Sequence, residues 1–190
     1  MKINIFVAPN KDSIVIYQLQ VANIMRLCAE RDITSETYVC ALGPESHKEQ
    51  WGNLPASAES VQMHNDATMQ FHSLLLQFNQ HNHPDTYAII IGDPNAMGEP
   101  EILDEVKNLY TILANNPKVN ILLSNSSGIT NPPEWNKEII VNGIMPYAKL
   151  QNAVTNLQNT HERFNRIDFN RPVDMQNMAA RFQSSHYFGR

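Results

Sequence analysis

The feature that most constrains the fold is a short, nearly uninterrupted run of apolar residues in the middle of the chain. Residues 87–91 read Tyr-Ala-Ile-Ile-Ile and lead into Gly92, Asp93 and Pro94. A strand with one solvent-exposed face alternates apolar and polar residues, whereas a strand that is covered on both faces is apolar throughout. The run therefore predicts a buried strand of a parallel sheet with helices on both faces.

Further strands and helices are expected to alternate on either side of this run. Such alternation predicts a parallel sheet with right-handed crossovers, because helices then connect successive strands. The spacing favours a three-layer, doubly wound α/β fold with five strands in the order 2-1-3-4-5. The expected strands cover residues 3–7, 37–42, 87–91, 119–123 and 138–141. The expected helices cover residues 13–31, 67–80, 101–115 and 146–161.

One domain is expected over residues 1–167, which is long enough to bury a real core. Within it, residues 43–66 are rich in Gly, Pro, Ser and Asn, and we interpret most of them as an irregular surface excursion with a helical start. The regular pattern fades after residue 168. Residues 168–190 are therefore expected to form a tail that packs on the domain or on a partner.

Composition and charge exclude several classes of protein. The chain is 42% hydrophobic and 17% charged, which indicates a globular protein. A net charge of -5 argues against nucleic acid as a partner, and the apolar runs are too short to span a membrane. No signal peptide is evident, and Cys28 and Cys40 are expected to be buried thiols of a cytoplasmic protein.

The expected strand order places a crevice at the carboxyl ends of the first and third strands. The candidate ligand-binding or phosphate-binding residues there are Asn10, Asp12, Asp93 and Ser124. Asp93 has three interpretations: a turn residue before Pro94, a phosphoryl acceptor or metal ligand, or a ligand-binding residue. Ser124 either satisfies loop amides or helps to cradle a small anion.

Three segments carry a resemblance: "YAIIIGDPNAMGEPEILDEVKNL", "VNILLSNSS" and "IIVNGIMPYAKLQNAVTNL". Together they make residues 85–157 resemble the second half of a response-regulator receiver domain. The resemblance implies a flavodoxin-like fold in bacterial signal transduction and phosphoryl transfer to an aspartate at the end of the third strand. It also implies Mg²⁺ held by an acid pair after the first strand, with a lysine and a Ser or Thr nearby.

The chain departs from the receiver pattern at the residues that carry this chemistry. Ala8 and Pro9 stand where the acid pair is expected, Met145 replaces the lysine, and Asp93 is displaced by one position; only Ser124 keeps its place. Mg²⁺ loses its best oxygen ligands without the acid pair. No cofactor is therefore expected, and Mg²⁺ enters only if Asp93 is an active acceptor.

The leading interpretation is a non-catalytic pseudo-receiver that acts through protein–protein interaction, with a homodimer left open. Its candidate partner-binding residues are an aromatic at the start of the last helix and three tail residues: Tyr147, Arg181, Tyr187 and Phe188. One alternative is a small flavodoxin-like or Rossmann-like enzyme that binds a nucleotide, nucleoside or phosphate. Another is an atypical phosphoreceiver that uses Asp93.

Other chemical signals are absent or weak. The chain has no G-x-G-x-x-G after its first strand and no P-loop. The histidines of "HNHPD", residues 81–85, are expected in a solvent-exposed loop, and no metal site is assigned because three or four converging ligands are needed. His161 is expected on the inner side of the last helix with its polar atoms satisfied.

Overall fold

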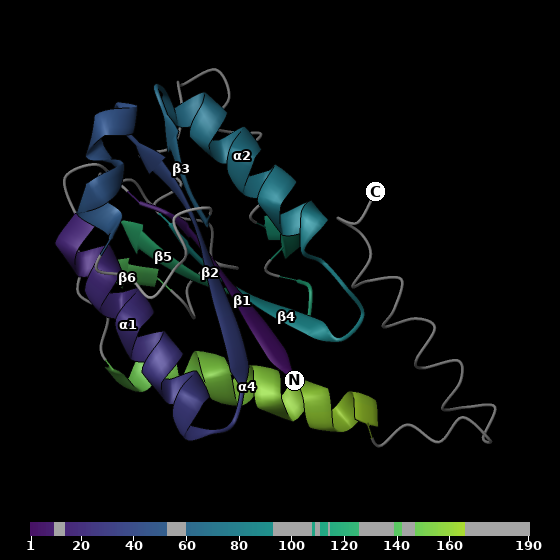
Figure 1. Cartoon of the computed structure of the whole chain (residues 1–190). Helices are drawn as coiled ribbons and strands as arrows, with labels where there is room; N and C mark the ends of the chain where they lie inside the picture. Colours follow the sequence, from purple (N-terminus) through teal and green to yellow (C-terminus); the bar gives the residue numbers. More distant parts are fainter. Residues whose placement is uncertain are drawn as a thin grey trace.

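The computed structural model contains a six-stranded, all-parallel sheet with helices on both of its faces (Figure 1). The structure describes residues 1–9, 14–52, 60–92, 108, 111–113, 115–125, 139–141 and 147–165. The strands are β1 (Lys2–Ala8), β2 (Thr34–Leu42), β3 (Val61–His64), β4 (Thr86–Gly92), β5 (Val119–Asn125) and β6 (Ile139–Val141). The helices are α1 (Ile14–Glu30), the 3₁₀ helix η1 (Glu45–Trp51), α2 (Ala67–Gln80) and α4 (Tyr147–Asn165).

The sheet order is β3-β2-β1-β4-β5-β6. The five strands expected from the sequence are present, and they neighbour one another as predicted; the additional β3 pairs outside β2 and changes the numbering from 2-1-3-4-5 to 3-2-1-4-5-6. Within the helix expected over residues 101–115, residues 108 and 111–113 are described as helical. The doubly wound α/β class is therefore confirmed, with one more strand than expected.

The helical start expected within residues 43–66 is confirmed, since residues 45–51 form η1. The interpretation of the remainder as an irregular surface excursion is wrong in two places: Trp51 is only 1% exposed, and residues 61–64 form the edge strand β3. This strand has only four residues, Val-Gln-Met-His. The alternation of its two apolar residues with two polar ones is the whole sequence pattern that could predict it. Such a short pattern is easily concealed between turn-forming residues.

Two separate hydrophobic cores fill the space between the sheet and its helices. On the side of α1 and α4, the core is largely aliphatic and includes Ile5, Val21, Ile89 and Val154. On the side of α2, the core combines aliphatic residues with the aromatic residues Phe6, Tyr38, Phe71 and Phe78. Alternate residues of the central strands point to opposite faces, which is why an all-apolar strand such as β4 feeds both cores.

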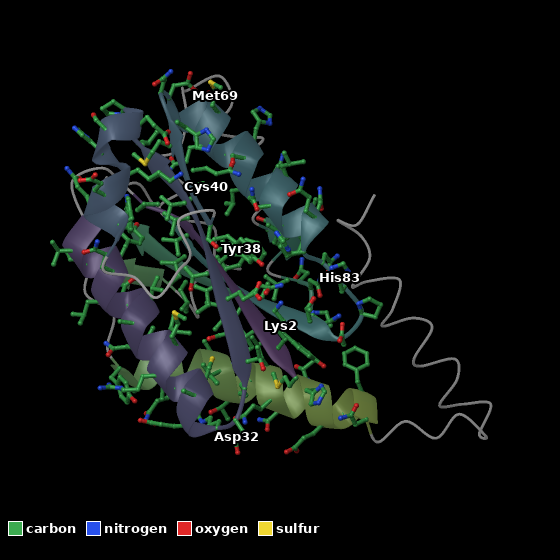
Figure 2. All side chains as sticks on the ribbon, in the orientation of Figure 1. Lys2, Asp32, Tyr38, Cys40, Met69 and His83 are labelled. Atoms are coloured by element: carbon green, nitrogen blue, oxygen red, sulfur yellow. The ribbon has the colours of Figure 1, made fainter. Side chains whose placement is uncertain are left out.

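Helix α1 ends in a turn with one residue in the left-handed conformation. That residue is Asp32, at a position where Gly is more usual. Ile33 N donates to Cys28 O at 2.8 Å and Asp32 N donates to Ala29 O at 3.3 Å, while Asp32 adopts φ 55°. These bonds define a Schellman motif, in which one residue takes the left-handed conformation. Figure 2 labels Asp32 in this turn and Met69 at the far end of the molecule, near the start of α2.

Both cysteines are buried and free, as expected from the sequence: Cys28 is 0% exposed and Cys40 is 1% exposed. Burial raises the pKa of each thiol to about 11. Both thiols are therefore protonated and weakly reactive at neutral pH. Within the described part of the chain, no helix is long and apolar enough to cross a bilayer.

Trp51 is expected to anchor η1 against α1. The Trp51→Ala variant should lose about 3–5 kcal/mol of unfolding free energy, since it removes a large side chain from a closed core and leaves a cavity. Urea unfolding followed by circular dichroism measures the loss. Glu49→Ala, at an exposed position of the same helix, is the control and should change stability by no more than about 0.5 kcal/mol. Equal stability of the two variants would contradict this anchoring role.

Candidate functional site

The carboxyl ends of β1 and β4 meet in the middle of the sheet. Their pairing continues to the last residue of each strand, where Ala8 lies opposite Gly92. The chain proceeds from β1 outward to β2 and β3, and then returns to β4 before it continues to β5 and β6 on the other side. Doubly wound sheets bind their ligands at such a reversal, in the crevice beyond the strand ends.

The candidate residues of this crevice come from neighbouring strand ends. Asn10 and Asp12 follow β1 and Asp93 follows β4, but all three lie outside the described residues. Ser124 lies inside β5 rather than after it; its backbone pairs with Ile140, and its side chain lies outside the description. The topology thus brings the strands that precede or contain these residues side by side. That the four residues form a binding site stays a prediction.

Of the candidate partner-binding residues, only Tyr147 lies in the described part of the chain. It is the first residue of α4 and is 37% exposed, and the Arg26 guanidinium carbon lies 5.6 Å from its ring centroid. This pair joins α1 to α4 through a cation–π contact. Arg181, Tyr187 and Phe188 are outside the described residues.

A buried glutamine, which sequence reasoning misses, lies at the carboxyl end of the sheet. Gln70 is 0% exposed, and its Nε2 donates to Pro9 O at 2.9 Å and to Cys40 O at 2.7 Å. Its Oε1 is buried and has no hydrogen-bond partner among the described residues. One feature of the sequence could have revealed it. Gln70 lies four residues before Leu74, so that it is a polar residue on the buried stripe of α2.

More polar groups accompany Gln70 on the α2 side of the sheet. Ser73 Oγ donates to Gln62 Oε1 at 2.8 Å and lies 3.5 Å from Cys40 Sγ, which Figure 2 labels. The alternation of β3 directs Gln62 and His64 to the same face. His64 Nε2 is also buried without a partner in the described part. The carboxyl end therefore holds two buried polar atoms without described partners.

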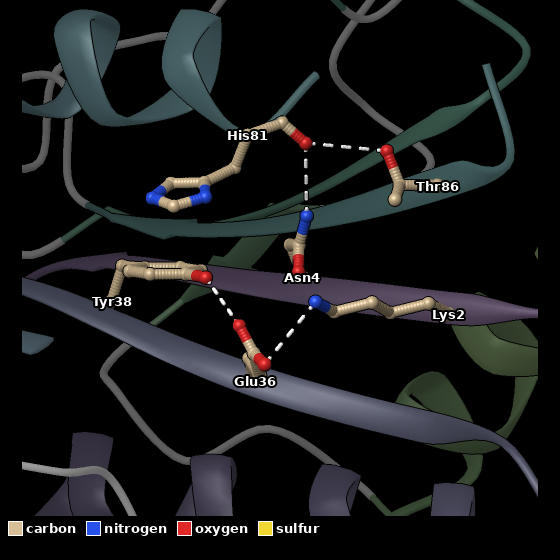
Figure 3. Close-up of polar contacts among 6 residues, drawn as sticks. All are labelled: Lys2, Asn4, Glu36, Tyr38, His81 and Thr86. Carbon is tan, nitrogen blue, oxygen red and sulfur yellow. Dashed lines mark hydrogen bonds and ion pairs between the residues drawn. The ribbon is translucent and has the colours of Figure 1, made fainter. Parts of the chain in front are cut away.

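The opposite, amino end of the sheet carries a second polar cluster (Figure 3). The Glu36 carboxylate accepts a hydrogen bond from the Tyr38 hydroxyl and lies 3.2 Å from Lys2 Nζ. The Tyr38 hydrogen bond, followed by the one from Lys2, holds the pKa of Glu36 below its usual value. The Tyr38 ring in turn stacks on His81, with the ring centroids 4.1 Å apart.

A small cavity lies beside this cluster. The His81 carbonyl accepts from Asn4 Nδ2 at 3.1 Å and from Thr86 Oγ1 at 3.2 Å, as Figure 3 shows. Asn4 Oδ1 has no described partner, and Asn4 lines a cavity of about 10 Å³. This volume suits a single water molecule, which Asn4 Oδ1 would bind, and it excludes an organic ligand.

Lys118 is the buried cation of this end of the molecule. It is 6% exposed, and its Nζ donates to His83 O at 3.1 Å and to Pro84 O at 2.8 Å. The Nζ also lies 5.3 Å from the centroid of the Tyr87 ring. Burial lowers the pKa of Lys118 to about 8, and the charge of Asp85 opposes this shift. Through these hydrogen bonds, Lys118 fastens the turn before β4 to the start of β5.

The histidines behave partly as expected. His83 is exposed, but His81 is half-buried against Tyr38, because it ends α2 directly above the sheet. His161 is satisfied, as predicted: its Nδ1 lies 3.0 Å from the Tyr87 hydroxyl and its Nε2 lies 3.0 Å from Asn165 Nδ2. Among the residues that the structure describes, no three His, Cys, Asp or Glu side chains are grouped to hold a metal ion.

The sheet order and its two helical layers define the chain as a doubly wound, flavodoxin-like α/β protein. Comparison with protein-family models, with curated proteins and with solved structures gives no match. The receiver resemblance therefore remains a prediction that rests on the pattern of the sequence.

The low pKa of Lys118 predicts a rise of stability with pH. Between about pH 8 and the ordinary lysine pKa of 10.5, the folded chain binds fewer protons at this residue than the unfolded chain, so that raising the pH favours folding. The unfolding free energy of the wild type, minus that of Lys118→Met, should therefore increase by at least about 1 kcal/mol across this window.

Urea unfolding of both proteins at a series of pH values tests this expectation. The subtraction cancels the thiols, whose raised pKa values act in the opposite direction over part of the same range. A difference that stays constant with pH would show that Lys118 remains charged in the folded state.

Proposed function

We propose that the protein binds a small nucleotide, nucleoside or sugar phosphate at the carboxyl ends of β1 and β4. The observation that carries this proposal is the reversal of strand order between these two strands. The order 3-2-1-4-5-6, which the additional edge strand completes, is also the order of the doubly wound sheets that bind dinucleotides. A dinucleotide itself is not proposed, because the chain lacks the glycine fingerprint.

The strand ends at the reversal suit the close approach of a ligand to the backbone. Ala8 and Gly92 are the facing terminal residues, so that no large side chain arises from either strand end. Helix α1 begins a few residues after β1, and the free N–H groups of a first helical turn attract anions. The first turn of α2 is less suitable, since Asp66 already accepts from Met69 N at 2.8 Å.

The residues proposed to contact the ligand are Asn10, Asp12, Asp93 and Ser124. Asn and Ser offer uncharged hydrogen-bonding groups, while the two carboxylates accept hydrogen bonds from ligand hydroxyls. We assign binding rather than a reaction, because the receiver lysine and acid pair are missing from the sequence. Phosphoryl transfer to Asp93 in the presence of Mg²⁺ is the chemical alternative.

Thermal unfolding with a defined panel tests the binding proposal. The panel contains adenosine, adenosine monophosphate, ribose 5-phosphate, inorganic phosphate, and Mg²⁺ with beryllofluoride. At least one organic member should raise Tm with increasing concentration, and a ligand at 100 times its Kd contributes about 2.7 kcal/mol. Asp93→Asn should reduce the rise, whereas Asp85→Asn, at an exposed position before β4, should preserve it.

The outcomes of this panel separate the hypotheses. A response to beryllofluoride alone, which disappears in Asp93→Asn, would support the atypical phosphoreceiver. A wild-type protein that no member of the panel stabilises would contradict small-ligand binding.

A docking role is the second candidate function, and Tyr147 is the observation that favours it. Aromatic and arginine side chains dominate interface hot spots, and Tyr147 presents a partly exposed ring with Arg26 beside it. In this role the cytoplasmic chain acts as a signalling module, and we take the partner to be a second copy of the chain.

Sedimentation equilibrium tests the homodimer. The wild type is expected to dimerise at micromolar concentration, and Tyr147→Ser should weaken association at least tenfold by removing the aromatic contact. Leu76→Ser is the matched control, because Leu76 is also exposed but belongs to α2 on the other side of the sheet. A wild-type monomer at all concentrations would contradict the docking role in this form.

A further inference from the structure

The outer face of α1 carries a row of exposed apolar side chains. Val15 is 76% exposed and Leu19 is 58% exposed, although the opposite face of the same helix is buried in the core. Ala22 and Arg26, which are also exposed, continue the row toward the end of the helix. These four residues, Val15, Leu19, Ala22 and Arg26, are called the α1 stripe. Single exposed apolar residues are common on protein surfaces, whereas adjoining ones mark a contact site.

Helix α2 provides the contrast. Its exposed apolar residues, Met69 and Leu76, are 53% and 57% exposed, but they lie seven residues apart, with the exposed His72 between them. Val15 and Leu19 lie four residues apart, so that their side chains are neighbours on the helix surface. The α1 stripe therefore differs from the outer face of α2 in continuity rather than in exposure.

The α1 stripe has the spacing of a coiled-coil seam, the line along which two helices pack. Its members follow one another at intervals of four, three and four residues. These intervals are the same in both directions, so that an antiparallel second copy of α1 is complementary to the first. Leu19 then opposes Ala22 of the second copy, and Val15 opposes the methylene chain of its Arg26. Each contact occurs twice, as a two-fold axis requires.

The charges of α1 and α4 also favour contact between copies. The whole chain has a net charge of -5, so that two copies repel each other unless the acids lie away from the interface. No charged residue occurs between Ile14 and Met25. The two helices contain three basic residues and two acidic ones, and the acidic ones lie in the last turn of each helix. Repulsion between copies is therefore small at this face.

Arg26 connects the α1 stripe to Tyr147. Helix α4 lies beside α1 on the same side of the sheet (Figure 1). The Arg26 guanidinium carbon lies 5.6 Å from the centroid of the Tyr147 ring, and Arg26 Nη2 donates to Asn23 Oδ1 at 3.3 Å. These contacts direct the charged end of Arg26 toward α4, and its methylene chain is then available to pack in the seam.

We propose that two copies of the chain associate through the α1 stripe, with the α1 helices antiparallel about a two-fold axis and Tyr147 at the edge of the contact. This inference rests on the docking role proposed above and assigns its interface. Helix α1 has 17 residues and is about 25 Å long. One pair of such helices with Tyr147 beside it belongs to the small interfaces of weak, reversible complexes. The dimer is therefore expected to have a Kd in the micromolar range.

Sedimentation equilibrium of two glutamate variants tests the surface. Leu19→Glu places a carboxylate in the seam from each copy and should weaken association at least about tenfold, because an unpaired charge resists burial. Leu76→Glu is the matched control, since it changes the same residue type at nearly the same exposure, 57% against 58%, on the other side of the sheet. It should change the Kd by no more than about twofold.

The outcomes distinguish this inference from the docking role. If neither glutamate variant weakens association while Tyr147→Ser does, or if both weaken it equally, the α1 stripe is not the interface and the docking role stands. A wild type that is monomeric at all concentrations would overturn both.

Cross-linking tests the antiparallel arrangement and covers the case in which Leu19→Glu fails to fold. Packed helix axes lie about 8–10 Å apart, so that a short bismaleimide can join opposed thiols, whereas Val15 and Arg26 of one helix are separated by about 16 Å. A mixture of Val15→Cys and Arg26→Cys proteins should give a mixed cross-linked dimer, and neither protein alone should give one. The native Cys28 and Cys40 are buried and do not compete. Cross-linking of each variant only with itself, or no cross-linking, would overturn the inference.

Discussion

The structure depends on the burial of β1 and β4 on both faces. These neighbouring strands supply Ile5 and Ile89 to the core beneath α1 and α4, and Phe6 and Ile90 to the core beneath α2. A slip of one residue in either strand would exchange the two sets of side chains between cores of different shape. The register that sets Ala8 opposite Gly92 is therefore strongly specified, and with it the position of the crevice.

The sequence predicts the parts of the fold that depend on long, regular patterns. The apolar run of β4, the helical stripe of α2 and the alternation of elements suffice for the class and for the neighbours of five strands. It does not predict β3, because four residues among turn formers carry too short a pattern. Trp51 shows the same difficulty, since one aromatic residue in a polar segment does not reveal whether it is buried.

The candidate site is less predictable than the fold, because it depends on single residues and on tertiary context. Topology alone directs attention to Asp93, as the residue after a central strand. Gln70 becomes significant only when Pro9 and Cys40, far from it in the sequence, are seen on either side of its amide. A polar residue on an otherwise apolar helical stripe indicates that something needs it, but the sequence does not identify the partner.

Both ends of the sheet carry a polar cluster and hold buried polar atoms without described partners. At the amino end, Lys2, Glu36 and Tyr38 contact one another, and the cavity beside them accommodates one water molecule. At the carboxyl end, Gln70 retains an acceptor without a described partner. What distinguishes the carboxyl end is the reversal of strand order between β1 and β4, the place at which doubly wound sheets bind ligands.

The lengths of the outermost strands have a consequence for solubility. Among the residues that the structure describes, the sheet ends in β3 on one side and β6 on the other, and these strands have four and three residues. A long, flat outer strand offers a row of free N–H and C=O groups on which a foreign strand can assemble, whereas a short one offers very few. The protein can therefore keep an almost wholly apolar strand at its centre with little risk of templated aggregation from its borders.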